Sequence, residues 1–111
     1  MKVLLDEDLD VKLRFRFGPA HQVSTVRHMN WLGKKNGKLL KLLVEHEFGA
    51  FLTADKKMRF EQNWRDYNVP VVFLDVPNLR YDTFKPLLPA LLALLAQPDL
   101  AGGIHVLTPN S

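Results

Sequence analysis

The sequence predicts a three-layer α/β/α domain around a mostly parallel sheet of about five strands. Short apolar runs alternate along the chain with segments of helical periodicity, which is the pattern of successive β-α-β units. The runs are continuous in apolar residues, as expected of strands that helices cover on both faces. The 111 residues fit one domain, which we assign to residues 1–111.

Five segments have the composition of strands: residues 2–6, 22–26, 50–53, 69–74 and 104–107. Segment 69–74 is strongly apolar and is expected in the interior of the sheet, whereas segment 104–107 is expected at an edge. We adopt the flavodoxin-like strand order 2-1-3-4-5, in which the winding reverses between the first and third strands. Ligands of such sheets bind at that reversal, beyond the carboxyl ends of the strands.

Helices are expected between these strands. The clearest covers residues 36–48, with Asn36 as its cap and Gly49 as its end. Its inner face carries Leu39, Leu40, Leu43 and Val44. A short helix is expected at residues 58–66. A Leu/Ala-rich helix is expected at residues 81–97, and its two prolines make the first turns irregular.

Residues 8–17 allow two interpretations. Strict alternation of apolar residues favours a strand, and hence a β-hairpin with the first strand. Against this, Asp8 is a good N-cap and Gly18-Pro19 stops a helix well. We favour the helix, because it completes a β-α-β crossover to the next strand.

The segment 87–96 has no polar residue, although a surface helix of a small domain normally has a polar face. This pattern predicts that the helix contributes to a homodimer or to a partner-binding groove. The alternative is that the alanines at 90, 93 and 96 form an outer face that needs no cover.

Composition narrows the class of protein. The chain has no cysteine, which excludes a disulfide framework, a thiolate nucleophile and a cysteine zinc site. Acidic residues appear too early for a signal peptide, and segment 87–96 is too short to span a bilayer. We therefore expect a cytoplasmic protein without a membrane segment. The net charge of +3 and the pI of about 9.3 are mildly basic.

Acidic residues follow two predicted strands at the point where each strand ends. Asp6 ends the first strand and Asp55 follows the third, so the topology should bring these two carboxylates together. Paired carboxylates suit Mg²⁺ or Mn²⁺, and such an ion can activate water and neutralise charge on a phosphodiester. Glu7 and Asp8 could add ligands. The structural alternatives are that Asp8 caps a helix, Glu7 faces solvent and Asp55 caps the next helix.

Basic residues surround this predicted site. They lie on segments that follow the second and third strands, where a phosphate backbone would meet them, and they are Lys34, Lys35, Lys56, Lys57 and Arg59. Trp31 could stack an unpaired RNA base. The alternatives are a solvated surface for the cations and a hydrophobic lid on the core for Trp31.

The chain resembles the PIN-like proteins grouped as DUF5615. The resemblance rests on residues 3–9 (VLLDEDL), 23–26 (VSTV), Gly33 and 52–56 (LTADK), and it extends weakly into residues 71–74. It implies a PIN-like fold related to metal-dependent ribonucleases, many of which are toxins of bacterial toxin–antitoxin pairs.

The resemblance also implies acidic residues at two further positions, where this chain has Asn36 and Lys57. The amide oxygen of Asn36 can still bind a metal ion, whereas Lys57 repels one.

Three functions follow as hypotheses. The first is a Mg²⁺- or Mn²⁺-dependent ribonuclease, the toxin of a toxin–antitoxin pair, with Asp6, Asp55 and Glu7 as catalytic residues and Asp8 and Asn36 as further ligands. The second is a catalytically weak PIN-like module that binds RNA or a protein. The third, a phosphoryl receiver domain, is disfavoured because no lysine ends the last strand.

Overall fold

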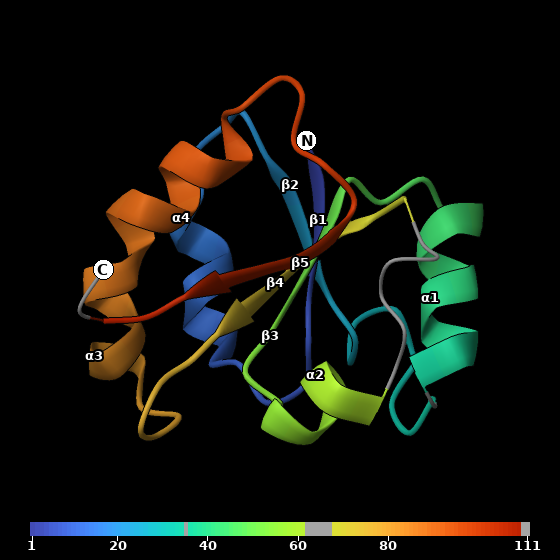
Figure 1. The fold of residues 1–111 in the computed structure, drawn as a ribbon, viewed down its shortest axis with the longest axis horizontal. Helices are drawn as coiled ribbons and strands as arrows, with labels where there is room; N and C mark the ends of the chain where they lie inside the picture. The colour runs from blue at the N-terminus through green and yellow to red at the C-terminus, as the bar shows by residue number, and fades with distance from the viewer. Residues whose placement is uncertain (35, 62–67, 110–111) are drawn as a thin grey trace.

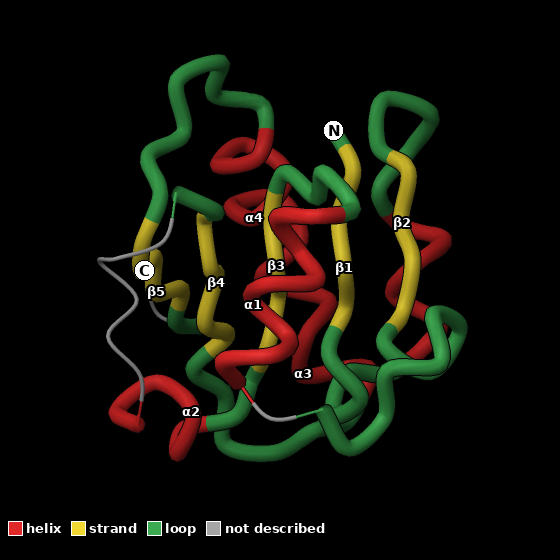
Figure 2. The backbone as a smooth tube through the Cα atoms, turned by 90° about the vertical axis from the view of Figure 1, so that its right-hand side faces the viewer, coloured by secondary structure: helices red, strands yellow, loops and turns green. Residues whose placement is uncertain are grey.

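The computed structural model describes residues 1–34, 36–61 and 68–109. All five predicted strands form one parallel sheet in the order β2-β1-β3-β4-β5 (Figure 2). The strands are β1 (Lys2–Leu5), β2 (Gln22–Thr25), β3 (Ala50–Thr53), β4 (Pro70–Leu74) and β5 (Gly103–Leu107). The order is the predicted one, so the winding reverses between β1 and β3. Segment 69–74 lies inside the sheet as β4, and β5 is an edge strand, as expected.

The register brings the carboxyl ends of the neighbouring strands level. Leu5 at the end of β1 pairs with Thr25 on one side and with Leu52 on the other. Asp6 therefore leaves the sheet beside Thr53, and the amide of Asp6 donates to the carbonyl of Leu52 over 2.9 Å. The loops that follow β1 and β3 start at the same edge.

Helices cover both faces of the sheet (Figure 1). Alternate strand residues point to opposite sides, so Val3 and Leu5 pack into one core while Leu4 packs into the other. The first core includes residues of the 3₁₀ helix η1 (Val11–Arg16), of α3 (Tyr81–Phe84) and of α4 (Leu88–Leu95). The second includes residues of α1 (Asn36–Glu45) and of α2 (Lys56–Glu61).

Residues 8–17 form neither the predicted α-helix nor the alternative hairpin. The segment contains η1, whose cap is Asp10 and not Asp8, since Asp10 Oδ1 accepts the amide of Lys12 over 2.9 Å. Asp8 is unavailable as a cap because its side chain reaches the loop after β3. The predicted inner face is nevertheless correct, and Leu9, Leu13 and Phe17 are all buried.

The helix predicted at residues 36–48 ends earlier, at Glu45. Three leucines of its predicted inner face are buried, but the fourth residue assigned to that face, Val44, is 55% exposed and lies on the outer side. The last carbonyls of this helix are closed by a Schellman motif, in which Phe48 N donates to Leu43 O and Glu47 N donates to Val44 O. Glu47 takes the left-handed position with φ of 58°, so Gly49 is not the residue that stops this helix.

The helix predicted at residues 58–66 begins earlier, at Lys56. Asp55 explains this start, because its Oδ1 accepts the amides of Lys57 and Met58 over 3.0 and 3.3 Å. Residues 62–66 of that prediction lie outside the described residues.

The segment predicted as one helix at residues 81–97 has irregular first turns, as expected from its prolines. It divides into α3, a 3₁₀ turn η3 (Lys85–Leu87) and α4. Every leucine from 87 to 95 is buried or half-buried, and the outer face is formed by Pro89 and the alanines at 90, 93 and 96. This is the alternative arrangement, which removes the reason to expect a homodimer through α4. Within the described residues, no helix is both long enough and apolar enough to cross a membrane.

Gly102 supplies a fold prediction, because a Cβ atom there would lie 2.7 Å from Cα of Asn68, inside contact distance of backbone. We expect Gly102→Ala to lower the free energy of unfolding by about 1–3 kcal/mol. At Gly37, in the first turn of α1, a Cβ atom would have no described atom within 4 Å apart from its chain neighbours and the backbone of its own helix. Gly37→Ala should therefore raise stability by about 0.5–1 kcal/mol. Urea titration of both variants measures the contrast, and equal shifts would contradict it.

Candidate functional site

An acidic cleft of about 150 Å³ opens at the carboxyl edge of the sheet, at the reversal between β1 and β3. The residues that line it are Asp6, Glu7, Val26, Trp31, Gly33, Lys34, Leu39, Asp55 and Met58. The predicted meeting of Asp6 and Asp55 is therefore seen in one cleft. Glu7 is exposed and also lines it, so it faces both solvent and the site.

Asp6 is the most enclosed carboxylate of the cleft, with 8% of its surface exposed. Its Oδ1 accepts the amide of Glu7 over 2.8 Å, and its Oδ2 accepts the hydroxyl of Thr53 over 2.6 Å. Burial raises the pKa of Asp6; these two hydrogen bonds oppose the rise, and the charges of Glu7 and Asp55 add to it. A bound cation would reverse the penalty that burial places on the charged form.

Thr53 is a site residue to which the sequence pattern assigned no role. It is fully buried at the end of β3, and its hydroxyl donates to Asp6 while accepting the amide of Asp55 over 3.1 Å. One hydroxyl thus fixes both acidic residues relative to each other. A hydroxyl residue at a strand end, two positions before an aspartate, is the sequence signal that could have identified it.

Asp55 combines two roles that the sequence left as alternatives. Its Oδ1 caps α2, and its side chain also lines the cleft. Among the described residues, the hydrogen bonds of this side chain use Oδ1, which leaves Oδ2 to face a ligand. Capping therefore orients this carboxylate without occupying it.

Asp8 lies close to the cleft but does not line it. Its Oδ2 accepts the amide of Ala54 over 3.2 Å, which ties the loop after β1 to the loop after β3. Its Oδ1 is buried and has no hydrogen-bond partner among the described residues. Burial, followed by the charge of Asp6, raises the pKa of Asp8 to about 7, and Asp55 adds to the effect.

The predicted basic residues take different positions. Lys34 is exposed and lines the cleft, and Lys57 is exposed on α2. Arg59 lies over the ring of Phe60, with a distance of 5.1 Å from its guanidinium carbon to the ring centroid. Lys56 instead forms an ion pair of 3.6 Å with Asp75, which follows β4. Lys35 lies outside the described residues.

Trp31 does not have the exposure that base stacking needs. Only 8% of it is exposed, and its ring packs edge-on against His46 and Phe48 at centroid distances of 4.9 and 6.0 Å. Burial in the core makes it a wall of the cleft, as the lid alternative expected.

The carboxylates of the cleft are oxygen donors, which are the ligands that Mg²⁺ and Mn²⁺ prefer. Within the described residues, no three His, Asp or Glu side chains lie close enough together to coordinate one metal ion. Asn36 begins α1, but its side chain is outside the description. The two carboxylates of Asp6 and Asp55 in the cleft would suit an ion that keeps most of its waters, which is the usual behaviour of Mg²⁺.

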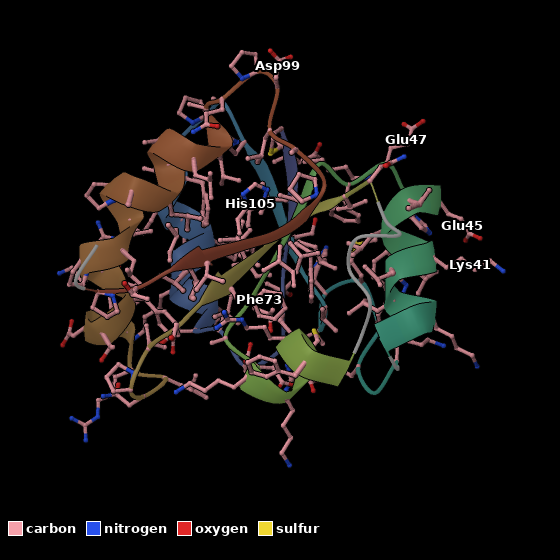
Figure 3. The ribbon with its side chains drawn as sticks, viewed as in Figure 1. Lys41, Glu45, Glu47, Phe73, Asp99 and His105 are labelled. Carbon is pink, nitrogen blue, oxygen red and sulfur yellow. The ribbon has the colours of Figure 1, made fainter. Side chains whose placement is uncertain are left out.

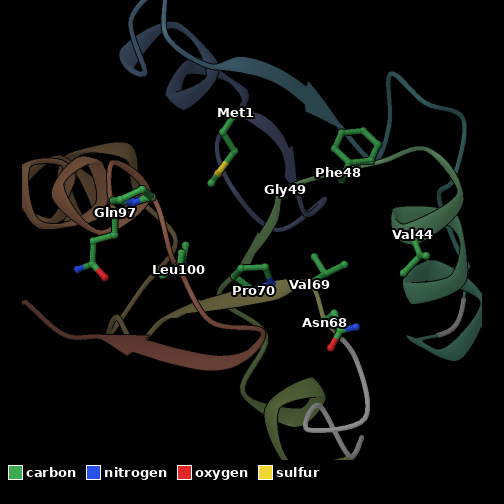
Figure 4. A pocket seen from close by; sticks show the side chains of 10 residues that line it. Met1, Val44, Phe48, Gly49, Asn68, Val69, Pro70, Gln97 and Leu100 are labelled. Carbon is green, nitrogen blue, oxygen red and sulfur yellow. The ribbon is translucent and has the colours of Figure 1, made fainter.

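A second cavity, of about 360 Å³, lies at the opposite edge of the sheet (Figure 4). Met1, Phe48, Val69 and Pro70 are among the residues around it, and its polar side chains are Asn68 and Gln97. Among the described residues, no carboxylate or imidazole lines this cavity, whereas carboxylates line the cleft at the carboxyl edge.

Comparison with known proteins found no matching family model, no similar curated protein and no similar solved structure.

Proposed function

We infer that this protein is a Mg²⁺- or Mn²⁺-dependent ribonuclease that hydrolyses RNA phosphodiesters in the cytoplasm. The observation that carries the proposal is the meeting of Asp6 and Asp55 in one cleft at the reversal of the sheet, fixed by the shared hydroxyl of Thr53. The resemblance to PIN-like proteins adds the expectation that the chain is the toxin of a toxin–antitoxin pair, with a cognate antitoxin as its protein partner.

In this proposal Asp6 and Asp55 hold the metal ion. When bound, the ion supplies positive charge to a phosphodiester and lowers the pKa of water. Glu7 is the exposed carboxylate of the cleft and can accept a proton from the attacking water. Lys34 lines the same cleft and can bind a phosphate oxygen. Asp8 positions the two loops through Ala54.

The test is cleavage of single-stranded RNA in Mn²⁺, with and without excess chelator. Asp6→Asn should lower the rate at least ~100-fold, because it removes charge that stabilises the transition state. Asp99→Asn is the matched control, since Asp99 is exposed on the loop before β5 and far from α2 (Figure 3). Undiminished cleavage in chelator would exclude the metal mechanism.

A catalytically weak module that binds RNA or a protein is the second candidate. It is favoured by the lack of a third grouped carboxylate among the described residues and by Lys57 at the start of α2. Metal-dependent stabilisation and RNA binding without any cleavage would support this candidate over the nuclease.

A further inference from the structure

A basic cluster surrounds Tyr81 on the face of the sheet that η1 and α3 cover. Lys12 Nζ, Arg16 Cζ and Lys85 Nζ lie 5.8, 5.6 and 5.9 Å from the centroid of the Tyr81 ring. The Arg16 guanidinium also donates through Nε to the Tyr81 hydroxyl. Figure 1 shows η1 as the blue coil beside α4, in the layer that contains α3.

An exposed aromatic ring extends this cluster. Phe15 is 77% exposed, although η1 buries its neighbour Leu13, and the guanidinium carbon of Arg14 lies 5.0 Å from the Phe15 ring centroid. We call the group Lys12, Arg14, Phe15, Arg16, Tyr81 and Lys85 the Tyr81 surface.

Among the described residues, the cations of the Tyr81 surface have no acidic partner in an ion pair. In residues 1–34, 36–61 and 68–109, none of the four has a carboxylate within salt-bridge distance, whereas Lys56 does. Asp10, the acidic residue nearest in sequence to Lys12, uses its side chain on the backbone of Lys12, and Asp82, the neighbour of Tyr81 in sequence, is exposed on α3. Each of the three cations around the ring lies within 5.9 Å of its centroid, so no two of them are more than about 12 Å apart. This separation is close to the screening length of about 10 Å, and the cations therefore repel one another. An anionic ligand would relieve that repulsion.

The segments that carry the Tyr81 surface follow the carboxyl ends of β1 and β4, on the sheet face of the first core. The apolar residues that line the acidic cleft, Val26, Trp31, Leu39 and Met58, belong to the second core. Lys12 follows Glu7 by only five residues, which limits their backbone separation to about 18 Å. The helix α2, whose Met58 lines the cleft, carries a similar pair, in which the guanidinium carbon of Arg59 lies 5.1 Å from the ring centroid of Phe60, and Phe60 is 79% exposed. An exposed phenylalanine with an arginine near its ring therefore follows each of the two aspartates along the chain, on η1 after Asp6 and on α2 after Asp55.

We propose that the Tyr81 surface binds the single-stranded RNA that passes through the acidic cleft. Its cations contact phosphates, and Phe15 stacks an unpaired base, which are the two contacts that sequence-tolerant single-strand binding combines. An acidic protein segment would satisfy the cations but would leave exposed Phe15 and Phe60 without a role. The inference deepens the proposed nuclease function by naming the path of its substrate.

The experiment measures binding, not cleavage, so that it is independent of the nuclease proposal. A labelled oligouridylate of about 12 nucleotides is titrated with the Asp6→Asn protein in chelator, and affinity is followed by anisotropy over a range of salt. The double variant Lys12→Gln plus Lys85→Gln should weaken RNA binding about tenfold and reduce the slope of log affinity against log salt concentration by about 1.4. The single variant Phe15→Ala should weaken RNA binding about fivefold or more. These side chains are exposed, so the substitutions leave the core intact.

Matched controls are Lys41→Gln and Val44→Ala on the outer side of α1, where Figure 3 shows Lys41 away from α3. They should change affinity less than about twofold. Equal losses in the control and test variants, or no loss in either, would overturn the inference. Polyglutamate that displaces the oligonucleotide at equal charge concentration would overturn it in favour of an acidic protein partner. RNA that binds here but is never cleaved would refute the nuclease proposal alone.

Discussion

Asp6→Asn and Asp55→Asn should each abolish the rise in melting temperature that Mn²⁺ gives the wild-type protein. A ligand that binds only the folded state stabilises it by about 2.7 kcal/mol at 100 times its dissociation constant. For a domain of this size that free energy corresponds to a rise of about 10 °C. Because the two carboxylates share one small cleft, loss of either removes half of the charge that we propose binds the ion.

The two variants should differ from each other in the absence of metal. Asp6→Asn removes a buried carboxylate whose pKa is raised by burial, so at neutral pH it should be more stable than wild type. Asp55→Asn should stay close to wild type, because asparagine also caps a helix well and can still accept the amides of Lys57 and Met58.

Calorimetry with and without Mn²⁺ measures both effects, with Asp99→Asn as the control that should respond to the ion like wild type. A full Mn²⁺ response in Asp6→Asn and Asp55→Asn would show that the ion binds elsewhere, and would remove the basis of the metal proposal.

The strand order and the position of the site could be predicted from the sequence because both depend on patterns that repeat. Continuous apolar strands separated by helical segments permit few topologies, and parallel strands place their carboxyl ends at one edge. The juxtaposition of Asp6 and Asp55 follows from that topology alone, without any knowledge of side-chain contacts.

Local details that depend on tertiary contacts were not predictable. Asp8 has the residue type of a helix cap, but its bond to Ala54 depends on the approach of two loops that are distant in sequence. Glu47 adopts a left-handed conformation that favours glycine, because the chain must turn there to bury Phe48. The role of Thr53 is not evident from its place at the end of an apolar strand, because it depends on Asp6, which the neighbouring strand β1 places beside it.

Asp8→Asn should change how the free energy of unfolding depends on pH. The pKa of Asp8 is about 7 in the folded protein, whereas the ordinary pKa of an aspartate, which applies to the unfolded chain, is 3.8. Between these two pH values the folded state therefore holds a proton that the unfolded state has released. Stability therefore falls as pH rises through this window, and it stays low above it, where Asp8 is charged in both states.

Asn at this position can still accept the amide of Ala54 and carries no charge. The variant should therefore match wild type within about 0.5 kcal/mol near pH 4, where Asp8 is protonated in the fold, and exceed it by about 1–3 kcal/mol near pH 8. The upper limit from the full shift is about 4 kcal/mol, and partial access of water to the residue reduces it. Urea titrations in chelator at several pH values measure the difference, with Asp99→Asn expected to show none.

If Asp8→Asn exceeds wild type in free energy of unfolding by the same amount at every pH, Asp8 is not the group that titrates. Addition of Mn²⁺ supplies a second check. A cation beside Asp6 and Asp55 favours ionised Asp8, so the advantage of Asp8→Asn near pH 8 should shrink when the ion is present. An advantage that persists unchanged in Mn²⁺ would place Asp8 outside the field of the ion. A reduced advantage would tie the unpartnered oxygen of Asp8 to the charge of the same site.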